Sequence, residues 1–350
     1  MNVRSYKETT TELSQDLAKL EFYAQQLEMD NTRLSVSEMI EKMKSDHFNL
    51  AVLGEFRRGK STLINSLLRT PVLPVDIVPT TACINRITYD AQPSALVERF
   101  DGSQEQVPLE ELKEYVTQEG KNIEGVREVT VWYPTVYCSN NVDIYDTPGL
   151  NDSPEMTRAT LDVISKMDIA IFTLNANVNF SMSECEFIGE RLLTSNVGKI
   201  IFVITRMGEY TPEQQERILK SIRARIEAMV LQKAERVLED QPEELAAFKR
   251  KLGDIRIFGV DSMMALEARR NHDGVLLEKS GFAAFEEAID ELLTRERGRI
   301  TLDKQTSAIL KASQDIFTTI QAKVSALGMD EETFQQKYAD TEKEIRSEER

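Results

Sequence analysis

Residues 54–61 read Gly-Glu-Phe-Arg-Arg-Gly-Lys-Ser and fit the pattern G-x-x-x-x-G-K-[ST]. A loop that wraps a pyrophosphate must aim backbone N–H groups inward, and this requires glycine where a Cβ would collide. In this pattern the Lys60 ammonium reaches the β- and γ-phosphates, and the Ser61 hydroxyl ligates Mg²⁺. The stretch therefore predicts a phosphate-binding loop. The alternative is an ordinary strand–turn–helix that binds nothing.

The segments on either side of this loop favour phosphate binding. The apolar run Leu50–Leu53 precedes it, and the helix-like stretch Ser61–Leu68 follows it. The N-terminal end of a helix is electropositive and attracts phosphate. The nucleotide contacts that we predict from this segment are consecutive: Gly54, Glu55, Phe56, Arg57, Arg58, Gly59, Lys60, Ser61 and Thr62.

A second motif, Asp146-Thr147-Pro148-Gly149, follows the strand-like run Val142–Tyr145. A carboxylate in this place holds Mg²⁺ through water, and the backbone N–H of Gly149 can sense a γ-phosphate. Between the two motifs, Val78–Cys83 stands where a switch loop supplies a threonine to Mg²⁺. The three motifs in this order predict a Mg²⁺-dependent nucleoside triphosphate site.

Composition narrows the class of protein. The chain has 350 residues, 41% of them hydrophobic, so one large domain with a smaller appendage is expected. The formal net charge of −16 argues against bulk nucleic-acid binding and against a polybasic membrane surface, because both partners are anionic. It does not exclude a local basic patch.

Cysteine and histidine usage indicates a reduced, cytosolic protein. Cys83, Cys138 and Cys185 form no C-x-x-C pair, which fits free thiols rather than a disulfide framework or a zinc site. His47 and His272 are the two histidines, which argues against histidine-based catalysis. No apolar run approaches the length of a membrane span, so we expect a soluble, unprocessed chain.

The elements that must position these motifs alternate between strands and helices, which predicts an α/β fold with a mostly parallel central sheet flanked by helices. Thr211-Pro212 predicts the start of a long amphipathic helix, with threonine as the N-cap. Besides Leu50–Leu53 and Val142–Tyr145, the strand-like runs are Ile169–Leu174, Ile200–Ile204 and Ile255–Val260.

Both ends of the chain carry helical apolar stripes, which we expect to pack on each other as a bundle; the alternative is an oligomer interface. The stripes are Leu13, Leu17, Leu20, Ala24, Leu27 and Leu34, with Asn31 in register, and Leu302, Ile309, Ile316, Ile320, Val324 and Leu327. The charged run 342–350 has no stop signal, which fits either a solvated tail or the front part of a longer protein. The predicted domains are one N-terminal bundle helix (1–46), a P-loop nucleotide-binding domain (47–298) and a C-terminal helix that packs on the N-terminal one (299–350).

Together these motifs resemble the dynamin superfamily of large GTPases, and most closely its bacterial dynamin-like members, over roughly residues 45 to 300. The flanking helices resemble the family's bundle-signalling element. The stretch Thr80–Ile87 resembles the mitofusin switch, which would make Thr81 the Mg²⁺ ligand, with Thr80 as the alternative. Gly281–Glu286 and Arg295–Arg299 are typical of the bacterial members.

The family's guanine motif, Thr/Asn-Lys-x-Asp, is altered here to Thr205-Arg206-Met207-Gly208. Arg206 can stack on a base or lie solvated on the surface, but the aspartate that pairs with guanine is missing. Glu209 or a carboxylate elsewhere could substitute; without one we expect only a modest preference for GTP over ATP. Asp261-Ser262 occupies the fifth-motif loop without its alanine–lysine pattern. The base contacts expected from the resemblance are Thr205, Arg206, Asp261 and Ser262.

The catalytic group differs from the Ras type, because Leu150 stands where glutamine would orient water. Phe56-Arg57 resembles the aromatic–arginine pair of guanylate-binding proteins, which would make Arg57 a finger acting in cis. The alternative is a static counter-charge, and we expect Arg58 to be the solvated arginine of the pair. The predicted catalytic residues are Arg57, Lys60 and Thr81, and the predicted Mg²⁺ ligands are Ser61, Thr81 and Asp146.

The resemblance implies a GTPase that binds GTP and GDP with Mg²⁺, dimerises through its nucleotide domains and drives a helical stalk in membrane remodelling. Two alternatives stand beside it: a nucleotide-gated interaction module with weak or no hydrolysis, and a monomeric regulatory GTPase. The expected partners are a second copy of the chain, and a membrane or a partner dynamin-like protein, but not nucleic acid. The expected location is the cytoplasm or the inner face of the cell membrane.

Overall fold

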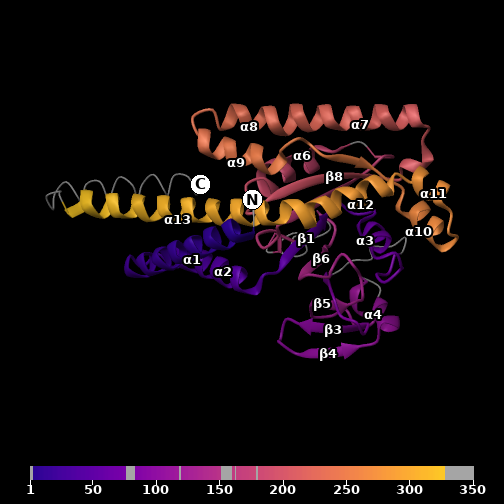
Figure 1. Ribbon diagram of the computed structural model, residues 1–350, viewed down its shortest axis with the longest axis horizontal. Coiled ribbons are helices and arrows are strands. Elements are labelled where there is room, and N and C mark those ends of the chain that lie inside the picture. Colours follow the sequence, from indigo (N-terminus) through magenta and orange to yellow (C-terminus); the bar gives the residue numbers. More distant parts are fainter. Residues whose placement is uncertain are drawn as a thin grey trace. The chain divides into compact units, whose positions relative to one another are not determined.

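The computed structural model describes residues 3–75, 83–117, 120–150, 160–161, 163–178 and 180–327. The chain divides into two compact units (Figure 1). The larger unit is Asp46–Lys304, and the smaller comprises Met1–Ser45 with Gln305–Arg350. Among the described residues, no helix is long and apolar enough to cross a membrane.

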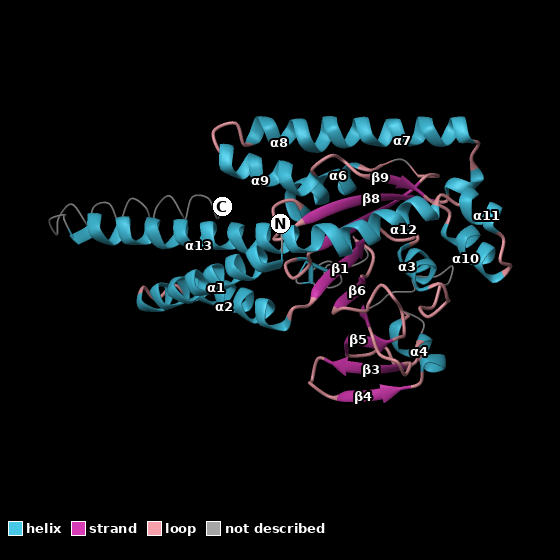
Figure 2. Ribbon diagram, in the orientation of Figure 1, coloured by secondary structure: helices cyan, strands magenta, loops and turns pink. Residues whose placement is uncertain are grey.

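The larger unit is built on a mixed sheet, which within the described residues has nine strands in the order β4-β3-β5-β2-β6-β1-β7-β8-β9 (Figure 2). Strands β6, β1, β7, β8 and β9 are parallel neighbours, whereas β2 is antiparallel to β6, and β3 to β4 and β5. The strands are β1 Phe48–Leu53, β2 Ile84–Thr88, β3 Ser94–Arg99, β4 Gln104–Val107, β5 Val126–Trp132, β6 Val142–Asp146, β7 Ile169–Asn175, β8 Lys199–Thr205 and β9 Ile257–Gly259.

The five strand-like runs predicted from the sequence are confirmed as the parallel half of this sheet. Every residue of β6, β7 and β8 is buried, as expected for parallel strands covered on both faces. The prediction did not identify β2, β3, β4 and β5. In β3, buried and partly exposed residues alternate along the first four residues, so the strand lacks the continuous buried run of β6, β7 and β8.

Two apolar cores lie on the two faces of the sheet, because successive side chains of a strand point to opposite faces. Leu50 and Val52 belong to the core that also contains α3 and α12, while Ala51 and Leu53 belong to the core that contains α7 and α9. The helices of this unit are α3 Lys60–Leu68, α4 Lys113–Val116, α6 Met182–Glu186, α7 Pro212–Ile226, α8 Gln232–Val237, α9 Pro242–Leu252, α10 Ser262–Arg270, α11 Gly274–Lys279 and α12 Phe282–Glu291.

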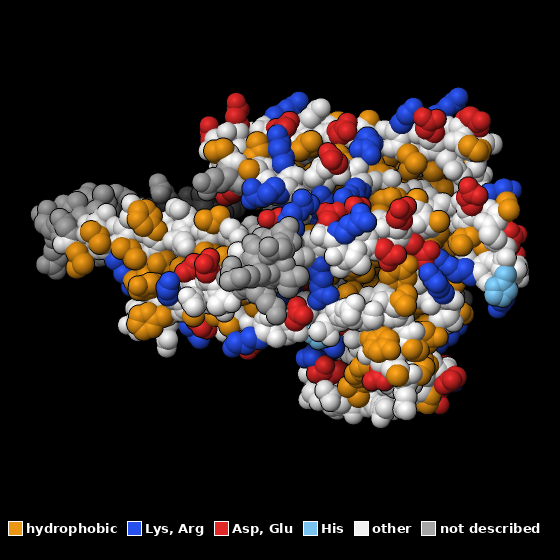
Figure 3. Space-filling view, in the orientation of Figure 1, with side chains coloured by type: hydrophobic (Ala, Val, Ile, Leu, Met, Phe, Trp, Pro, Cys, Tyr) orange, Lys and Arg blue, Asp and Glu red, His pale blue; other side chains and the backbone are white. Residues whose placement is uncertain are grey.

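Helix α7 begins as the sequence predicts. The Thr211 side chain accepts the backbone N–H of Gln214, the Gln214 side chain accepts that of Thr211, and Pro212 is the first helical residue. This reciprocal capping satisfies two N–H groups that the helix itself leaves unpaired. Acidic and basic side chains are interspersed on the surface over α7 and α8 (Figure 3), and one such pair is Lys220–Glu216.

The smaller unit is a bundle of α1 Val3–Gln26, α2 Asp30–Ser45 and the part of α13 Arg297–Leu327 that begins at Gln305. Leu17 of α1, Val36 and Met39 of α2 and Ala312 of α13 form its buried core. The expected packing of the two terminal stripes on each other is therefore confirmed. The far end of the second stripe is not covered by described residues, since Val324 is 63% exposed.

The expectation that one helix carries the N-terminal stripe through Leu34 is wrong. Glu28 has a φ of 60°, and the N–H of Met29 donates to the Ala24 carbonyl at 2.9 Å. With the bond from Glu28 N–H to the Gln25 carbonyl, these contacts form a Schellman motif, which ends a helix. The chain reverses there, and Leu34 is 53% exposed on the second helix.

A buried ion pair fixes the first turns of α13 to the sheet. The Lys304 ammonium donates to Asp168 Oδ1 at 2.8 Å and to the Met167 carbonyl at 2.7 Å. Asp168 Oδ2 accepts the backbone N–H of Asn49 in β1 at 2.8 Å. Because both charged side chains are at most 5% exposed, removing either one leaves the other without its counter-charge.

We predict that Lys304→Ala lowers the free energy of unfolding by about 3–5 kcal/mol, because it removes the Lys304 ammonium from beside the buried Asp168 carboxylate. Lys311→Ala, an exposed position on the same helix, should change it by less than about 0.5 kcal/mol. Denaturant unfolding followed by circular dichroism measures both. Equal small effects would show that the pair does not stabilise the fold.

Candidate active site

A cavity of about 630 Å³ lies at the carboxyl ends of the central parallel strands, where ligands bind in open α/β sheets. It brings together most of the predicted contacts: Phe56, Arg57, Arg58, Gly59, Lys60, Ser61, Thr62, Gly149, Thr205, Arg206, Asp261 and Ser262. Gly54, Glu55 and Asp146 are not among the lining residues. Thr81 and its alternative Thr80 lie outside the described residues.

The loop between β1 and α3 curls around the Lys60 ammonium. Lys60 Nζ donates to the carbonyl oxygens of Gly54 at 3.0 Å and of Glu55 at 3.2 Å, and the residue is 7% exposed. Gly54 has a φ of 146°, and a Cβ there would come within 2.6 Å of the Thr173 carbonyl oxygen. Only glycine fits so close to β7, so the motif glycine has a structural reason in this chain.

The predicted Mg²⁺ ligands Ser61 and Asp146 are brought together. Ser61 Oγ donates to Asp146 Oδ2 at 2.8 Å, and both residues are buried. The neighbouring Thr147 hydroxyl donates to the Val52 carbonyl at 2.9 Å, which fixes the end of β6 against β1. A hydroxyl and a carboxylate are hard oxygen donors, so the donor set fits Mg²⁺ with phosphate oxygens.

The residue after the second motif cannot orient water. Leu150 is 2% exposed and lies in the apolar core beside β1 and β7, and its backbone N–H donates to the Gly54 carbonyl at 3.2 Å. Its side chain has no hydrogen-bonding atom. A polar group that orients an attacking water must therefore come from another residue.

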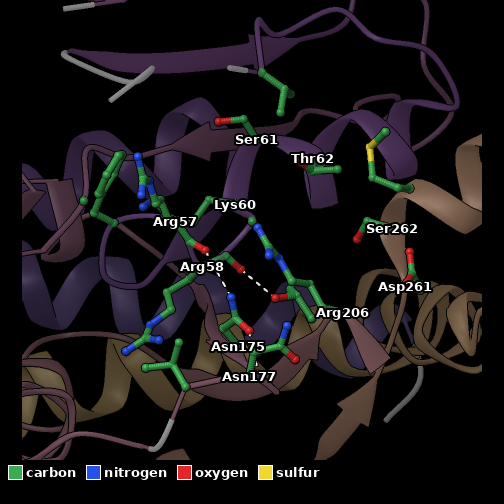
Figure 4. A pocket seen from close by; sticks show the side chains of 17 residues that line it. Arg57, Arg58, Lys60, Ser61, Thr62, Asn175, Asn177, Arg206, Asp261 and Ser262 are labelled. Atoms are coloured by element: carbon green, nitrogen blue, oxygen red, sulfur yellow. Dashed lines mark hydrogen bonds between the residues drawn. The ribbon is translucent and has the colours of Figure 1, made fainter. Parts of the chain in front are cut away.

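Arg57 lines the cavity at the opposite end from Asp261, with Lys60 and Arg206 between them (Figure 4). Its guanidinium carbon is 5.1 Å from the centroid of the Phe56 ring, a cation–π contact. Its φ is 59°, and its carbonyl accepts the Asn175 side-chain amide at 3.4 Å. A left-handed conformation is costly for a residue with a Cβ, so contacts around the loop hold Arg57 in it.

The prediction that Arg58 is the solvated arginine is wrong. Arg58 is 4% exposed; its Nε donates to Glu184 Oε1 and its terminal nitrogen to Glu55 Oε2, both at 2.8 Å. Arg58 points inward while Arg57 points out, and Glu184 is the residue it reaches. Burial raises the pKa of the Glu184 carboxyl, although hydrogen bonding from Ser181 and the charge of Arg58 act against that shift.

The altered guanine motif is linked to the phosphate loop. The Thr205 hydroxyl donates to the Arg58 carbonyl at 2.8 Å, and Arg206 follows with a φ of 61°. Glu209 does not line the cavity: its Oε2 accepts the Asn177 side-chain amide at 2.6 Å, and the residue is exposed. Lining residues that the sequence did not predict are Val75, Asn175, Asn177, Val178 and Met263.

Asn175 could have been predicted from the sequence. It directly follows the predicted strand Ile169–Leu174 and is the last residue of β7, and residues at the carboxyl ends of parallel strands meet at one edge of the sheet. Asn177 follows two residues later, and its backbone N–H donates to Asn175 Oδ1 at 2.8 Å. Val75 and Met263 carried no signal of this kind, since an apolar residue in a loop matches no motif.

We predict that Arg58→Ala destabilises the protein by about 3–5 kcal/mol at neutral pH, because it strands the buried Glu184 carboxylate. The folded-state pKa of Glu184 is already raised and should rise further, so the loss should shrink as the pH falls and Glu184 takes up a proton. Urea unfolding at pH 5 and pH 8 measures this dependence. Arg58→Ala/Glu184→Gln is the control, and it should show a smaller loss with a weaker pH dependence; equal losses in both variants at both pH values would contradict the pairing.

Comparison with known sequences finds one matching family and several similar proteins. A sequence model of the Dynamin family matches residues 50–207. The chain is 29% identical to the "uncharacterized protein in xynA 3′region" of Caldicellulosiruptor sp., over 81% of this chain and 66% of that protein. It is 25% identical to the bacterial dynamin-like protein of Nostoc punctiforme, over 71% of this chain and 37% of that protein. The matched part of the chain thus spans less than two thirds of the length of each of these relatives.

A solved structure described as "An oligomerised bacterial dynamin pair provides a mechanism for the long range sensing and tethering of membranes" superposes with a TM-score of 0.54 and 17% identity. The match covers 98% of this chain and 52% of the other, and at this identity it shows the fold alone. The family match spans the phosphate loop and Asp146, the last residue of β6. Residues 50–207 therefore match the Dynamin family, and the chain is similar to bacterial dynamin-like proteins.

Proposed function

We propose that this chain binds GTP with Mg²⁺ in the cavity at the carboxyl edge of the sheet and hydrolyses it to GDP and phosphate. The observation that carries the proposal is the arrangement of Lys60, Ser61 and Asp146. A loop lysine buried among backbone carbonyls stands beside a hydroxyl–carboxylate pair 2.8 Å apart. This is the arrangement that a triphosphate and its cation require.

In the bound state, Lys60 exchanges its carbonyl partners in the loop for phosphate oxygens, and the loop N–H groups take up the remaining phosphate charge. Ser61 and Asp146 would hold Mg²⁺, which neutralises charge on the β- and γ-phosphates. Thr81 stays a proposed third ligand from the switch segment. The Gly149 N–H, at the cavity wall, is in place to detect the γ-phosphate.

The catalytic role falls to Arg57 in this proposal. Phosphoryl transfer spreads negative charge over the γ-oxygens and the leaving oxygen, and a guanidinium placed there stabilises the transition state more than the ground state. Arg57 lines the cavity and contacts the Phe56 ring, within the phosphate loop itself. A rotation of its side chain carries the charge from the ring onto the phosphates.

Self-association of two nucleotide domains across the cavity face is the proposed trigger for that rotation. The bacterial dynamin structure that shares this fold is described as an oligomerised pair that senses and tethers membranes. By analogy we propose a nucleotide-dependent dimer of this chain, acting in membrane remodelling from the cytoplasm or the inner face of the membrane. Helix α13, which contributes residues to both units, is the element that would carry the cycle to the bundle.

A titration of GTP, GDP and ATP, with and without Mg²⁺, tests the proposal when phosphate release is followed against protein concentration. Specific activity that rises with concentration supports an assembling GTPase. Tight Mg²⁺-dependent binding without turnover would replace it with a nucleotide-gated module. Absence of triphosphate binding would overturn the site assignment.

We predict that Lys60→Ala weakens GTP binding at least ~100-fold, because it removes two charge-assisted contacts to the phosphates. Lys220→Ala, an exposed lysine of α7, is the matched control and should leave affinity unchanged. Isothermal titration calorimetry with a non-hydrolysable GTP analogue measures both. Affinity of the Lys60 variant within a few fold of the parent would place the phosphates elsewhere.

We predict that Arg57→Ala leaves GTP affinity within a few fold but lowers kcat at least ~100-fold, or about 2.7 kcal/mol at ~1.36 per decade. It should also flatten the dependence of the rate on protein concentration. Arg217→Ala, an exposed arginine of α7, should do neither. If Arg57→Ala weakens binding as much as turnover, Arg57 is a static counter-charge.

A further inference from the structure

The base end of the cavity lacks a carboxylate on the segment where the family carries one, since Gly208 stands in place of the aspartate of its guanine motif. Glu209 does not replace it, because its carboxylate is exposed and bonded to Asn177. The structure offers another carboxylate at the same place. It belongs to Asp261, between β9 and α10, which reaches the cavity from the opposite segment.

The side chain of Asp261 fills the space that a side chain at position 208 would enter. A Cβ built on Gly208 would lie 2.5 Å from Asp261 Oδ2, 3.1 Å from Asp261 Cγ and 2.6 Å from Cε at the flexible end of Met264. The distances to Asp261 are too short for residues 208 and 261 both to carry side chains in their present positions. A carboxylate at position 208 and the present carboxylate of Asp261 would therefore occupy the same space.

Asp261 is held firmly in this position. Its Oδ1 accepts the backbone N–H of Met264 at 2.9 Å as the N-cap of α10, and its own N–H donates to the Ser280 carbonyl at 2.7 Å. The cap directs Oδ1 toward the helix, and Oδ2 lies toward Gly208. Figure 4 shows Asp261 beside Ser262 at the end of the cavity away from Arg57, in the same view as Arg206.

The chemistry of a fixed carboxylate at the base end selects one purine. An ionised carboxylate only accepts hydrogen bonds. Guanine presents two donors side by side, N1–H and the 2-amino group, whereas adenine presents an acceptor at N1 and no donor at C2. Two bonds to a charged group amount to roughly a hundredfold or more in affinity.

We propose that Asp261 is the guanine-selecting residue of this GTPase, and that it reads N1–H and the 2-amino group from the β9–α10 segment across from Gly208. The inference rests on the proposed GTP site and specifies its base selectivity. It replaces the modest preference expected from the altered motif with a strong one. The carboxylate is retained, but a different loop supplies it.

Asp261→Asn tests this without disturbing the cap, because asparagine caps helices about as well as aspartate. Calorimetric titration with GDP, ADP and XDP should show that GDP binding weakens at least ~30-fold, ADP binding stays within a few fold, and XDP binding strengthens. Xanthine carries a carbonyl at C2 that the new amide can donate to. Asp273→Asn is the matched control: Asp273 caps α11 through Leu276 in the same way, and this change should leave all three affinities unaltered.

A second set of variants, which moves the carboxylate from position 261 to position 208, separates a loss of base selectivity from a loss of folding. Asp261→Ser shortens the side chain and keeps a capping oxygen, so it should lose the preference for GDP over ADP. Adding Gly208→Asp to it should restore that preference at least ~10-fold, since the Asp261 carboxylate no longer occupies this volume and the flexible end of Met264, the other close neighbour of a side chain at 208, can move aside. Gly208→Asp alone should weaken GDP binding, because the two carboxylates then compete for one volume.

Two outcomes would overturn the inference. One is a parent protein that binds GDP and ADP equally, and the other is an Asp261→Asn variant with an unchanged GDP-to-ADP ratio. Both leave the phosphate site intact, since ADP and GDP still bind. A parent protein that binds no nucleotide diphosphate or triphosphate would instead remove the proposed function itself.

Discussion

The close approach of the phosphate loop to β7 is the constraint on which the site depends. Gly54 lies so near the Thr173 backbone that a Cβ would collide with its carbonyl oxygen. From this fixed point the loop is tied to the other strands, because the Gly54 carbonyl accepts the Leu150 N–H after β6 and the Arg58 carbonyl accepts the Thr205 hydroxyl of β8. Elements distant in sequence thus converge on one loop, and each brings its own group to the cavity.

A negative chain can still present a cationic site, since the net charge and the local field are separate quantities. The formal charge is −16, yet Arg57, Lys60 and Arg206 all line the cavity. Arg58 also lines the cavity, but Glu55 and Glu184 offset its charge. The positive field of the cavity therefore comes mainly from Arg57, Lys60 and Arg206, while the buried Arg58–Glu184 pair holds the loop in shape.

Local sequence encodes the parts of this site that depend on backbone conformation. The glycine–lysine–serine pattern, the strand before Asp146 and the Thr211 cap could be predicted, because each is determined by neighbours a few residues away. The burial of Arg58 could not, since Glu184 comes from a segment far along the chain. The same holds for Asp261, whose closeness to Gly208 exists only once β8 and β9 are paired. The helix break at Glu28 escaped prediction because no glycine or proline marks it.

Strand β1 leads into the phosphate loop and β7 contacts it. The opposite ends of the same two strands anchor α13 through Asp168. β1 leads into Gly54, and β7 passes Thr173 near its carboxyl end; at the amino end, Asp168 bonds Asn49 of β1 and holds Lys304 of α13. Both strands are paired on each edge and covered on each face. Displacing either one alone would break ladder bonds and open a packed core, which costs more than a loop or side-chain rotation. We therefore expect the anchored first turns of α13 to move as one body with the sheet in the proposed GTP cycle, while the Arg57 side chain and the loops around the cavity move relative to that body.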